Sequence, residues 1–147
     1  RPRAALQRRP VRLRPQPAAG AALRDFLDDL SAGDYERAAL GYAGPYDILI
    51  GWNPNVIDPQ DHAGLLRAGC EINGLQCLTT RTVEPAGRSE LGLSFDVTFS
   101  TRDGALFERG PCCGGNATDN PPESDFTYTV VKIAGAYRVL ELPPYVP

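Results

Sequence analysis

Residues 91–100 read Leu-Gly-Leu-Ser-Phe-Asp-Val-Thr-Phe-Ser, and this stretch decides the fold because apolar side chains alternate with small or polar ones. Successive side chains of a strand point to opposite faces of a sheet, so a period of two predicts a half-buried antiparallel strand. The other face is polar and carries Asp96 away from the core. The apolar face consists of Leu91, Leu93, Phe95, Val97 and Phe99.

Further strands are expected on both sides of this segment. Asp103 and Gly104 predict a hairpin turn, and Ala134 and Gly135 predict a second one. Together these strands predict an antiparallel meander in the C-terminal half. The additional strands are expected at residues 78–84, 105–109, 126–133 and 137–142.

The N-terminal half has the helical period instead. From about Ala21 the apolar residues recur at helical spacing until Gly33, which predicts an amphipathic helix with one buried stripe. Asp34 is placed to cap a second helix, so the two helices form a tight hairpin. The first stripe consists of Leu23, Phe26, Leu27 and Leu30, and the second of Tyr35, Ala38, Ala39 and Tyr42.

Two shorter segments complete this half. The apolar run 46–52 predicts a strand or a buried loop. Asp58 followed by Pro59 predicts the start of a third helix, because an aspartate cap and a proline in the first turn are both favoured there. This helix is expected to end near Gly69 or Cys70.

The charges divide the chain into two parts. Residues 1–20 contain six arginines and no acid, whereas residues 21–147 contain nine basic and eighteen acidic residues. The first part also has four prolines and little apolar surface, which predicts a solvated linker or arm. It is either a spacer or a contact for anionic lipid, cell-wall polymer or nucleic acid. The spacer is favoured and no nucleic-acid partner is expected, because no aromatic residue lies among the arginines to stack on bases.

Residues 21–147 predict a single domain, since about 100–200 residues per domain is usual. No run approaches the roughly 18 uninterrupted apolar residues of a membrane helix, so no transmembrane segment is expected. The sequence has no methionine, which predicts either a processed chain, from which an N-terminal signal or anchor was removed, or an excised piece of a longer chain. Arginine outnumbers lysine fourteen to one, as is typical of a GC-rich genome and also of some thermophile families.

The order of elements resembles the nuclear-transport-factor-2-like superfamily, also called SnoaL-like, with its cystatin-like cone. The resemblance covers residues 21–142 and implies an α+β fold in which a curved sheet wraps around a long first helix. It also implies a pocket between the concave sheet face and the helices, in a bacterial protein of the secreted or lipoprotein type. The phrases that carry it are Phe26-Leu27, Leu30, Gly33-Asp34-Tyr35 and Ala38-Ala39, then residues 126–132 followed by Gly135, Tyr137 and Val139.

Four cysteines, Cys70, Cys77, Cys112 and Cys113, favour disulfides and an oxidising compartment. Four cysteines allow three pairings, and the sequence does not choose between them. A Cys70–Cys77 bridge is favoured because it would join the end of the third helix to the next strand, which leaves Cys112 and Cys113 as a vicinal pair. Zinc is not expected, because the spacings do not form two C-x₂₋₄-C pairs. The vicinal pair lies in a loop insertion at residues 111–124.

Five aromatic residues are the candidates for the pocket, with Asp47 as the best placed spare acid. Aromatic side chains also serve ordinary core packing, which is the competing interpretation. A ligand in such a pocket would be largely apolar with one or two polar groups. The candidates are Tyr42, Tyr46, Trp52, Phe95 and Tyr128.

The ionisable residues favour no catalytic set. Asp96 is expected on the outer sheet face, and Glu108, Glu141 and His62 are expected at the surface. The sequence shows no triad, phosphate-binding glycine loop or dinucleotide motif, so neither a cofactor nor a metal is expected.

The sequence therefore predicts a non-catalytic accessory domain outside the cytoplasm, secreted or membrane-anchored, that binds a small apolar ligand or an envelope protein through the cone pocket. One alternative is an isomerase- or dehydratase-like enzyme, which needs an acid or histidine facing the pocket beside Tyr42 or Tyr46. Another is a homodimerisation or assembly module that pairs through the outer sheet face, although Ser94 and Asp96 give that face little apolar surface.

Overall fold

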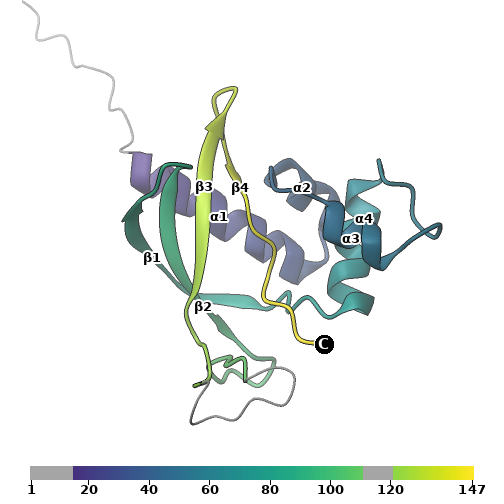
Figure 1. Cartoon of the computed structure of the whole chain (residues 1–147). Coiled ribbons are helices and arrows are strands. Elements are labelled where there is room, and N and C mark those ends of the chain that lie inside the picture. The colour runs from purple at the N-terminus through teal and green to yellow at the C-terminus, as the bar shows by residue number, and fades with distance from the viewer. Residues whose placement is uncertain (1–14, 111–120) are drawn as a thin grey trace, which may run out of the picture.

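The computed structural model describes residues 15–110 and 121–147. This part of the chain forms an α+β fold of four α-helices, a π-helical turn and a four-stranded antiparallel sheet (Figure 1). The α-helices are α1 (Pro15–Ala32), α2 (Tyr35–Leu40), α3 (Asp47–Trp52) and α4 (His62–Ala68), and the π-helical turn is Gly69–Asn73. The strands are β1 (Thr79–Arg88), β2 (Leu93–Ser100), β3 (Phe126–Ile133) and β4 (Ala136–Val139).

The sheet is the predicted meander, with the strand order β1-β2-β3-β4. Along β2 the residues alternate between buried and half-buried, which confirms the period of two. The inner face begins at Leu93, because Leu91 lies exposed in the preceding turn. Residues 105–109 do not form the expected strand, and they pair only through isolated bridges such as Ser100 with Leu106.

The two edges of the sheet differ. The edge of β4 is covered by the segment after α2, since Ala43 N–H donates to Val139 O and Val139 N–H donates to Gly41 O, both at 2.8 Å. At the other edge, β1 pairs with β2, and its register slips between Thr80 and Thr82 and again after Pro85.

Helix α1 packs along the inner face of the sheet, and the buried stripe predicted for it is confirmed. The helix starts at Pro15, six residues before the expected start, and Ala19 is completely buried. Proline is tolerated in a first turn because its missing N–H has no helical partner there. Residues 15–20 therefore belong to the domain. The inner layer of the core consists of Leu23, Phe26, Leu27 and Leu30 with Phe95, Val97, Phe99, Tyr128, Val130 and Val139.

Helices α2, α3 and α4 lie together near the C-terminal end of α1 (Figure 1). The carboxylate of Asp34 accepts Arg37 N–H at 3.3 Å, as expected of the cap of α2. The run 46–52, expected to be a strand or a buried loop, forms the helix α3 with Tyr46 as its N-cap residue. Its C-cap residue Asn53 is buried and donates to Leu49 O at 2.9 Å, which satisfies a carbonyl near the helix end.

The third predicted helix, α4, begins later than expected. Asp61 is its cap and accepts Gly64 N–H at 3.0 Å. Asp58 instead accepts Gln60 N–H at 2.8 Å, so it closes a turn before the helix. The helix ends at Ala68 and continues as the π-helical turn, close to the predicted end.

The chain continues past β4 as an extended segment. Gln76 N–H donates to Pro144 O at 2.8 Å, and Val146 N–H donates to Gly74 O at 3.0 Å. The C-terminal residues thus lie beside the segment that joins the π-helical turn to β1. Strand β4 itself ends at Val139, three residues before the predicted end.

Candidate functional site

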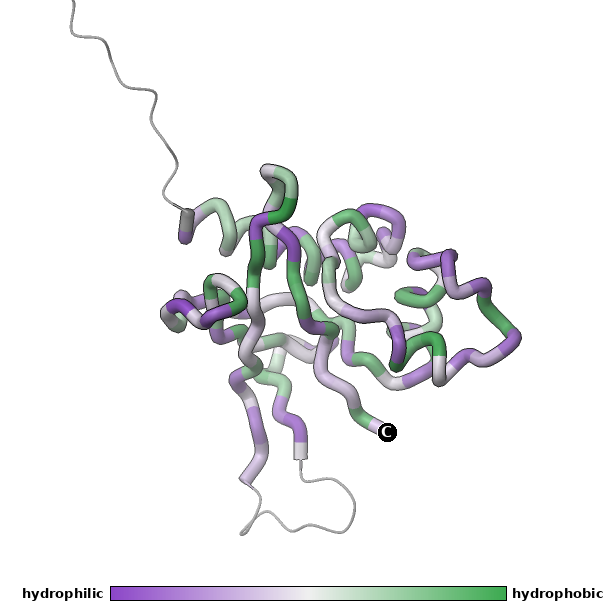
Figure 2. The backbone as a smooth tube through the Cα atoms, turned by 45° about the horizontal axis from the view of Figure 1, so that its top comes forward, coloured by the Kyte–Doolittle hydropathy of each residue, from purple (hydrophilic) through white to green (hydrophobic). Residues whose placement is uncertain are grey.

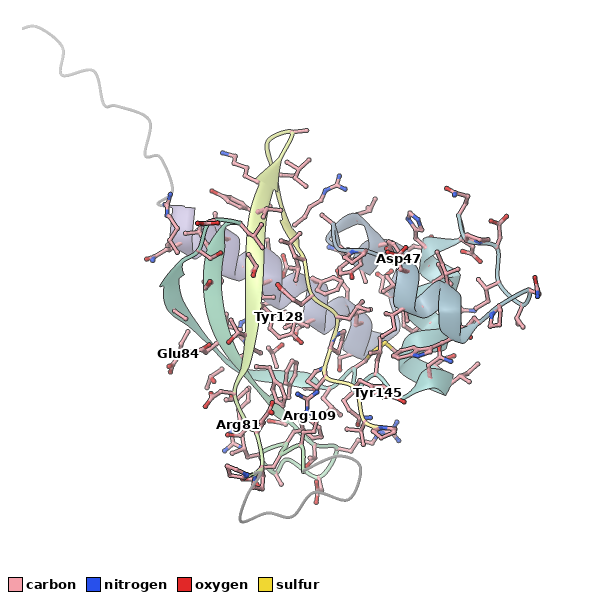
Figure 3. All side chains as sticks on the ribbon, in the orientation of Figure 1. Asp47, Arg81, Glu84, Arg109, Tyr128 and Tyr145 are labelled. Atoms are coloured by element: carbon pink, nitrogen blue, oxygen red, sulfur yellow. A yellow bond between two sulfur atoms is a disulfide. The ribbon has the colours of Figure 1, made fainter. Side chains whose placement is uncertain are left out.

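Phe95 and Tyr128 lie in the layer between the sheet and α1, with only 2% and 1% of their surfaces exposed. The Tyr128 hydroxyl donates to Leu142 O at 3.2 Å. Burial is the main cause that raises the pKa of Tyr128, so this hydroxyl stays neutral. Figure 3 shows Tyr128 at the middle of β3. Both residues occupy core positions.

Tyr42 and Tyr46 form a second group at the junction of α1 with the other helices. The Tyr42 ring stacks on Phe26 at 5.6 Å and meets the edge of Tyr46 at 5.1 Å. The Tyr42 hydroxyl donates to Pro45 O at 2.9 Å. The Tyr46 hydroxyl is buried and has no hydrogen-bond partner among the described residues, and burial raises the pKa of Tyr46 to about 12.

Trp52 lies apart from both groups, against Tyr145 of the C-terminal segment, with ring centroids 4.8 Å apart. The five aromatic candidates therefore fall into three separate groups. The structure brings Tyr42 and Tyr46 together and leaves Trp52 elsewhere.

His62 and Asp96 are placed as the sequence predicts. His62 is exposed and stacks face to face on the Tyr46 ring at 4.0 Å. Asp96 lies on the outer sheet face, where its carboxylate accepts the Thr127 hydroxyl at 3.1 Å. Asp47 is in the first turn of α3, on the helical side of the molecule (Figure 3).

Glu141 was expected at the surface, and that expectation is wrong. It is half-buried, and its carboxylate oxygens accept Thr129 N–H at 2.6 and 3.0 Å. Burial raises the pKa of Glu141 above its usual value, more than these hydrogen bonds lower it. The charge of Glu141 also contributes to the raised pKa values of Tyr42 and Tyr128, after burial. Glu141 lies two positions beyond β4, so the alternation of residues along a strand could not predict that it is half-buried.

A cleft with a volume of about 840 Å³ lies at the C-terminal end of α1. Sequence reasoning missed it, because its walls come from segments far apart in the chain. Those walls are the last turn of α1, the π-helical turn, the segment 74–79 and the end of β2. We call it the disulfide cleft because Cys70 and Cys77 line it.

The Cys70–Cys77 disulfide is present, with a Cα–Cα distance of 5.6 Å, and this confirms the favoured pairing. It ties the π-helical turn to the residues just before β1, which fixes one wall of the cleft. Cys112 and Cys113 and most of the predicted loop insertion lie outside the described residues, as do residues 1–14.

The disulfide cleft is lined mainly by polar groups that are not charged. The Tyr35 hydroxyl donates to Glu71 at 3.3 Å, and burial is the main cause that raises the pKa of Tyr35. The side-chain amide of Gln76 donates to Gly74 O at 3.0 Å. Hydroxyl groups come from Ser31, Thr79, Ser100 and Thr101, and a guanidinium from Arg102.

A second cleft of about 440 Å³ lies between β3 and the C-terminal segment. The basic side chain that lines this cleft, Arg109, is already paired. It forms an ion pair with Glu123 at 2.9 Å and lies 5.3 Å from the centre of the Phe126 ring. A third cleft of about 350 Å³ lies between α2 and the start of α4. Tyr128 lines the second cleft, and the other four aromatic candidates line none of the three.

Within residues 15–110 and 121–147, no three His, Cys, Asp or Glu side chains are grouped as a metal ion would require. None of the helices in that part is long and apolar enough to cross a membrane. No family model, curated protein or solved structure gives a significant match to this chain.

Proposed function

We propose that this chain is a non-catalytic binding domain of the extracytoplasmic space, with a nuclear-transport-factor-2-like cone as its architecture. We place its ligand in the disulfide cleft and not among the five aromatic residues. The observation that carries the proposal is the cleft itself, whose volume of about 840 Å³ lies within the usual range for small-molecule sites.

The lining of the cleft favours a small, uncharged molecule that both donates and accepts hydrogen bonds. Hydroxyls of Ser31 and Thr79 lie 3.5 Å apart and each can act as donor or acceptor. The last turn of α1 also borders the cleft, and carbonyl groups at a helix C-terminus carry partial negative charge. This differs from the apolar ligand expected for the cone, because apolar side chains fill the layer between α1 and the sheet.

The disulfide supports a location outside the cytoplasm, since such bonds persist in oxidising environments and are rare in the cytosol. The enzyme alternative would rest on Glu141, whose charge acts on Tyr42, or on His62, which stacks on Tyr46. His62 is exposed to solvent and is not enclosed in a pocket. Both oxygens of the Glu141 carboxylate accept a backbone N–H, however, so the group serves the fold. The proposal therefore leaves catalysis out.

Titrations of the uniformly ¹⁵N-labelled protein followed by NMR test the proposal. The probes are glucose, N-acetylglucosamine and triglycine amide, which separate sugars from peptides, with 1-decanol as the apolar comparison. Saturable shifts at Ser31, Gln76 and Thr101 with at least one polar probe are expected. Ala32→Trp, at the cleft, should abolish them, and Ala21→Trp, at an exposed position on the same helix, should not.

Two results would refute the cleft as the binding site. One is the absence of saturable shifts with every polar probe. The other is 1-decanol binding that shifts Phe95 and Tyr128 and survives Ala32→Trp, which would return the ligand to the aromatic core.

A further inference from the structure

Glu71 lines the disulfide cleft with its side chain exposed to solvent. Its carboxylate is oriented, because Oε1 accepts the Tyr35 hydroxyl at 3.3 Å. Tyr35 is itself fixed, since only 7% of its surface is exposed and the Arg67 guanidinium lies 5.6 Å from the centre of its ring. This hydrogen bond uses one of the roughly four acceptor positions of a carboxylate, so the others stay available to a ligand.

The backbone that carries Glu71 is held in place. Leu75 N–H donates to Gly69 O at 2.9 Å, which closes the π-helical turn, and the neighbouring residue Cys70 is fixed by the disulfide. Beyond the turn, residues 74–79 are bonded to the C-terminal segment, which passes between the sheet and the helical side of the molecule (Figure 2). The wall of the cleft is therefore formed before a ligand arrives, which lowers the entropic cost of binding.

The two charged side chains of the cleft are opposite in sign, and neither is neutralised by a neighbour. In the described part of the chain, the only ion pair joins Arg109 to Glu123. Glu71 and Arg102, which line the cleft, are thus unpaired with any charged group of that part. Because these two charges cancel in sum, the cleft favours a ligand without net charge.

The cleft also offers hydrogen-bond acceptors that a ligand can satisfy. The last four carbonyl groups of a helix have no helical partner, and in α1 the N–H groups that follow the helix bind those of Asp29 and Leu30. Among the described residues, no N–H beyond the helix is bonded to the carbonyls of Ser31 and Ala32, and both residues line the cleft. The Glu71 carboxylate is likewise an acceptor only. A ligand for these groups needs several donors.

A polyol meets this requirement better than a peptide or an amine. Each hydroxyl of a polyol supplies a donor, and it can also accept from the hydroxyls of Ser31 and Thr79, which lie 3.5 Å apart. A peptide backbone adds a carbonyl for every N–H, and those carbonyls would face the carbonyl groups at the end of α1. An amine donates but carries a positive charge at neutral pH, which the Arg102 guanidinium repels.

We propose that the disulfide cleft binds a small polyol, a sugar or a sugar alcohol, whose hydroxyls donate to the Glu71 carboxylate and to the end of α1. This inference rests on the proposed function, which places the ligand in the same cleft. Hydrogen bonds to a carboxylate are about twice as strong as those between neutral groups, so Glu71 is the main contact. Tyr35 acts on the ligand only through Glu71 and is a positioning residue.

NMR titrations of the ¹⁵N-labelled full chain test the class of ligand. The probes are myo-inositol, sorbitol and glucose, with cyclohexanol as the matched comparison, because it keeps the six-carbon ring of inositol but has a single hydroxyl. Saturable shifts at Ser31 and Gln76 are expected with at least one polyol, and cyclohexanol should bind at least about tenfold more weakly. Since the polyols are uncharged, added salt should not lower their affinity, whereas it would lower that of the cation putrescine.

Substitutions at the cleft test the contacts. Glu71→Gln keeps the shape and an acceptor oxygen but loses the charge, so the affinity for the polyol should fall at least about tenfold. Tyr35→Phe should lower the affinity about threefold, and in the Glu71→Gln background it should have no further effect, as a positioning role requires. Glu36→Gln is the matched control, since it removes an exposed acid of α2 that does not line the cleft, and it should leave the affinity unchanged.

Four outcomes would overturn the inference. If triglycine amide binds in the cleft and no polyol does, the proposed function stands and the polyol is wrong. Salt-sensitive binding of putrescine in place of the polyols would assign Glu71 to a cation. An equal loss with Glu36→Gln would show that net charge, and not the carboxylate in the cleft, controls binding. No binding of any polar probe would refute the cleft as a site together with this inference.

Discussion

The Glu141 carboxylate accepts the Thr129 N–H, at a position where a longer β4 would pair through its backbone. Strand β4 ends at Val139, and Leu140 N–H still donates to Thr129 O at 3.0 Å. The next hydrogen bond of Thr129, from its own N–H, goes to the two side-chain oxygens of Glu141. The side chain thereby completes the ladder at the point where the backbone turns away toward Pro143 and Pro144.

Replacing Glu141 distinguishes its role as an acceptor from the effect of its charge. Glu141→Gln keeps an acceptor oxygen for Thr129 N–H, so the free energy of unfolding at neutral pH should stay within about 1 kcal/mol of the wild type. Glu141→Ala leaves that N–H without its partner and should cost about 1–2 kcal/mol. Urea denaturation of both variants measures the difference. Equal effects of the two changes would show that the hydrogen bond does not matter.

The same residue predicts a pH dependence. Burial raises the pKa of Glu141 above its unfolded value of about 4.5, so the folded state holds the proton more tightly. The resulting stabilisation is complete below the unfolded pKa and is lost as the pH rises through the folded pKa. Relative to Glu141→Gln, the wild type should therefore lose stability as the pH rises above the unfolded pKa of about 4.5 and through the raised folded pKa. Denaturation curves at several pH values test this, and a difference that grows in the opposite direction would contradict it.

Tyr42 and Tyr46 offer a matched pair of hydroxyl deletions. Tyr42→Phe removes the hydrogen bond to Pro45 O and leaves that carbonyl without its donor, at a cost of about 1 kcal/mol. Tyr46→Phe removes a buried hydroxyl that has no partner among the described residues, so stability should be unchanged or higher. Thermal denaturation of the two variants checks the order. A larger loss for Tyr46→Phe would mean that its hydroxyl has a partner in solution.

Two truncations separate residues 1–14 from the start of α1. Deleting residues 1–14 should change the melting temperature by no more than about 2 °C, since their composition offers little apolar surface to bury. Deleting residues 1–20 also removes buried Ala19 and the contact of Gly20 with Phe95. That deletion should lower the melting temperature by roughly 4–8 °C. Equal melting temperatures would show that α1 is stable without its first turns.

The disulfide can be tested in a single peptide. Trypsin cleaves after Arg67 and Arg81, so Cys70 and Cys77 leave the protein together. Without reduction, this peptide should be lighter by two hydrogen atoms and resist alkylation. Replacing both cysteines by serine should lower the free energy of unfolding by about 2–3 kcal/mol, because the bridge closes a short loop. An alkylated peptide from unreduced protein would contradict the pairing.

Local patterns predicted the elements that bury one face. The alternation of β2, the stripe of α1 and the cap at Asp34 are each a direct consequence of side-chain periodicity or of an unpaired helix N–H. The Cys70–Cys77 pairing could be favoured because the two residues flank a short turn. In these cases the physical cause lies within about ten residues of sequence.

The features that sequence reasoning missed depend on distant neighbours. The run 46–52 is apolar at nearly every position, so its period does not separate strand from helix, and Asn53 caps it through Leu49 and Asn73. Asp58 and Asp61 are the same residue type and are equally suitable as the N-cap of α4. Only the conformation of the backbone decides that Asp61 takes this role. The disulfide cleft brings together the end of α1 and the end of β2, about 70 residues apart, which no local pattern encodes.

The irregular edge of β1 has a consequence for the protein at high concentration. An open sheet edge is a template on which another copy can add a strand and begin aggregation. Pro85 offers no N–H to such a strand, and the register slips on both sides of it would break a continuous ladder. Arg81 and Glu84 add charge along the same strand (Figure 3). We therefore expect this edge to hinder the addition of a strand from another copy, even though β1 is the longest of the four described strands.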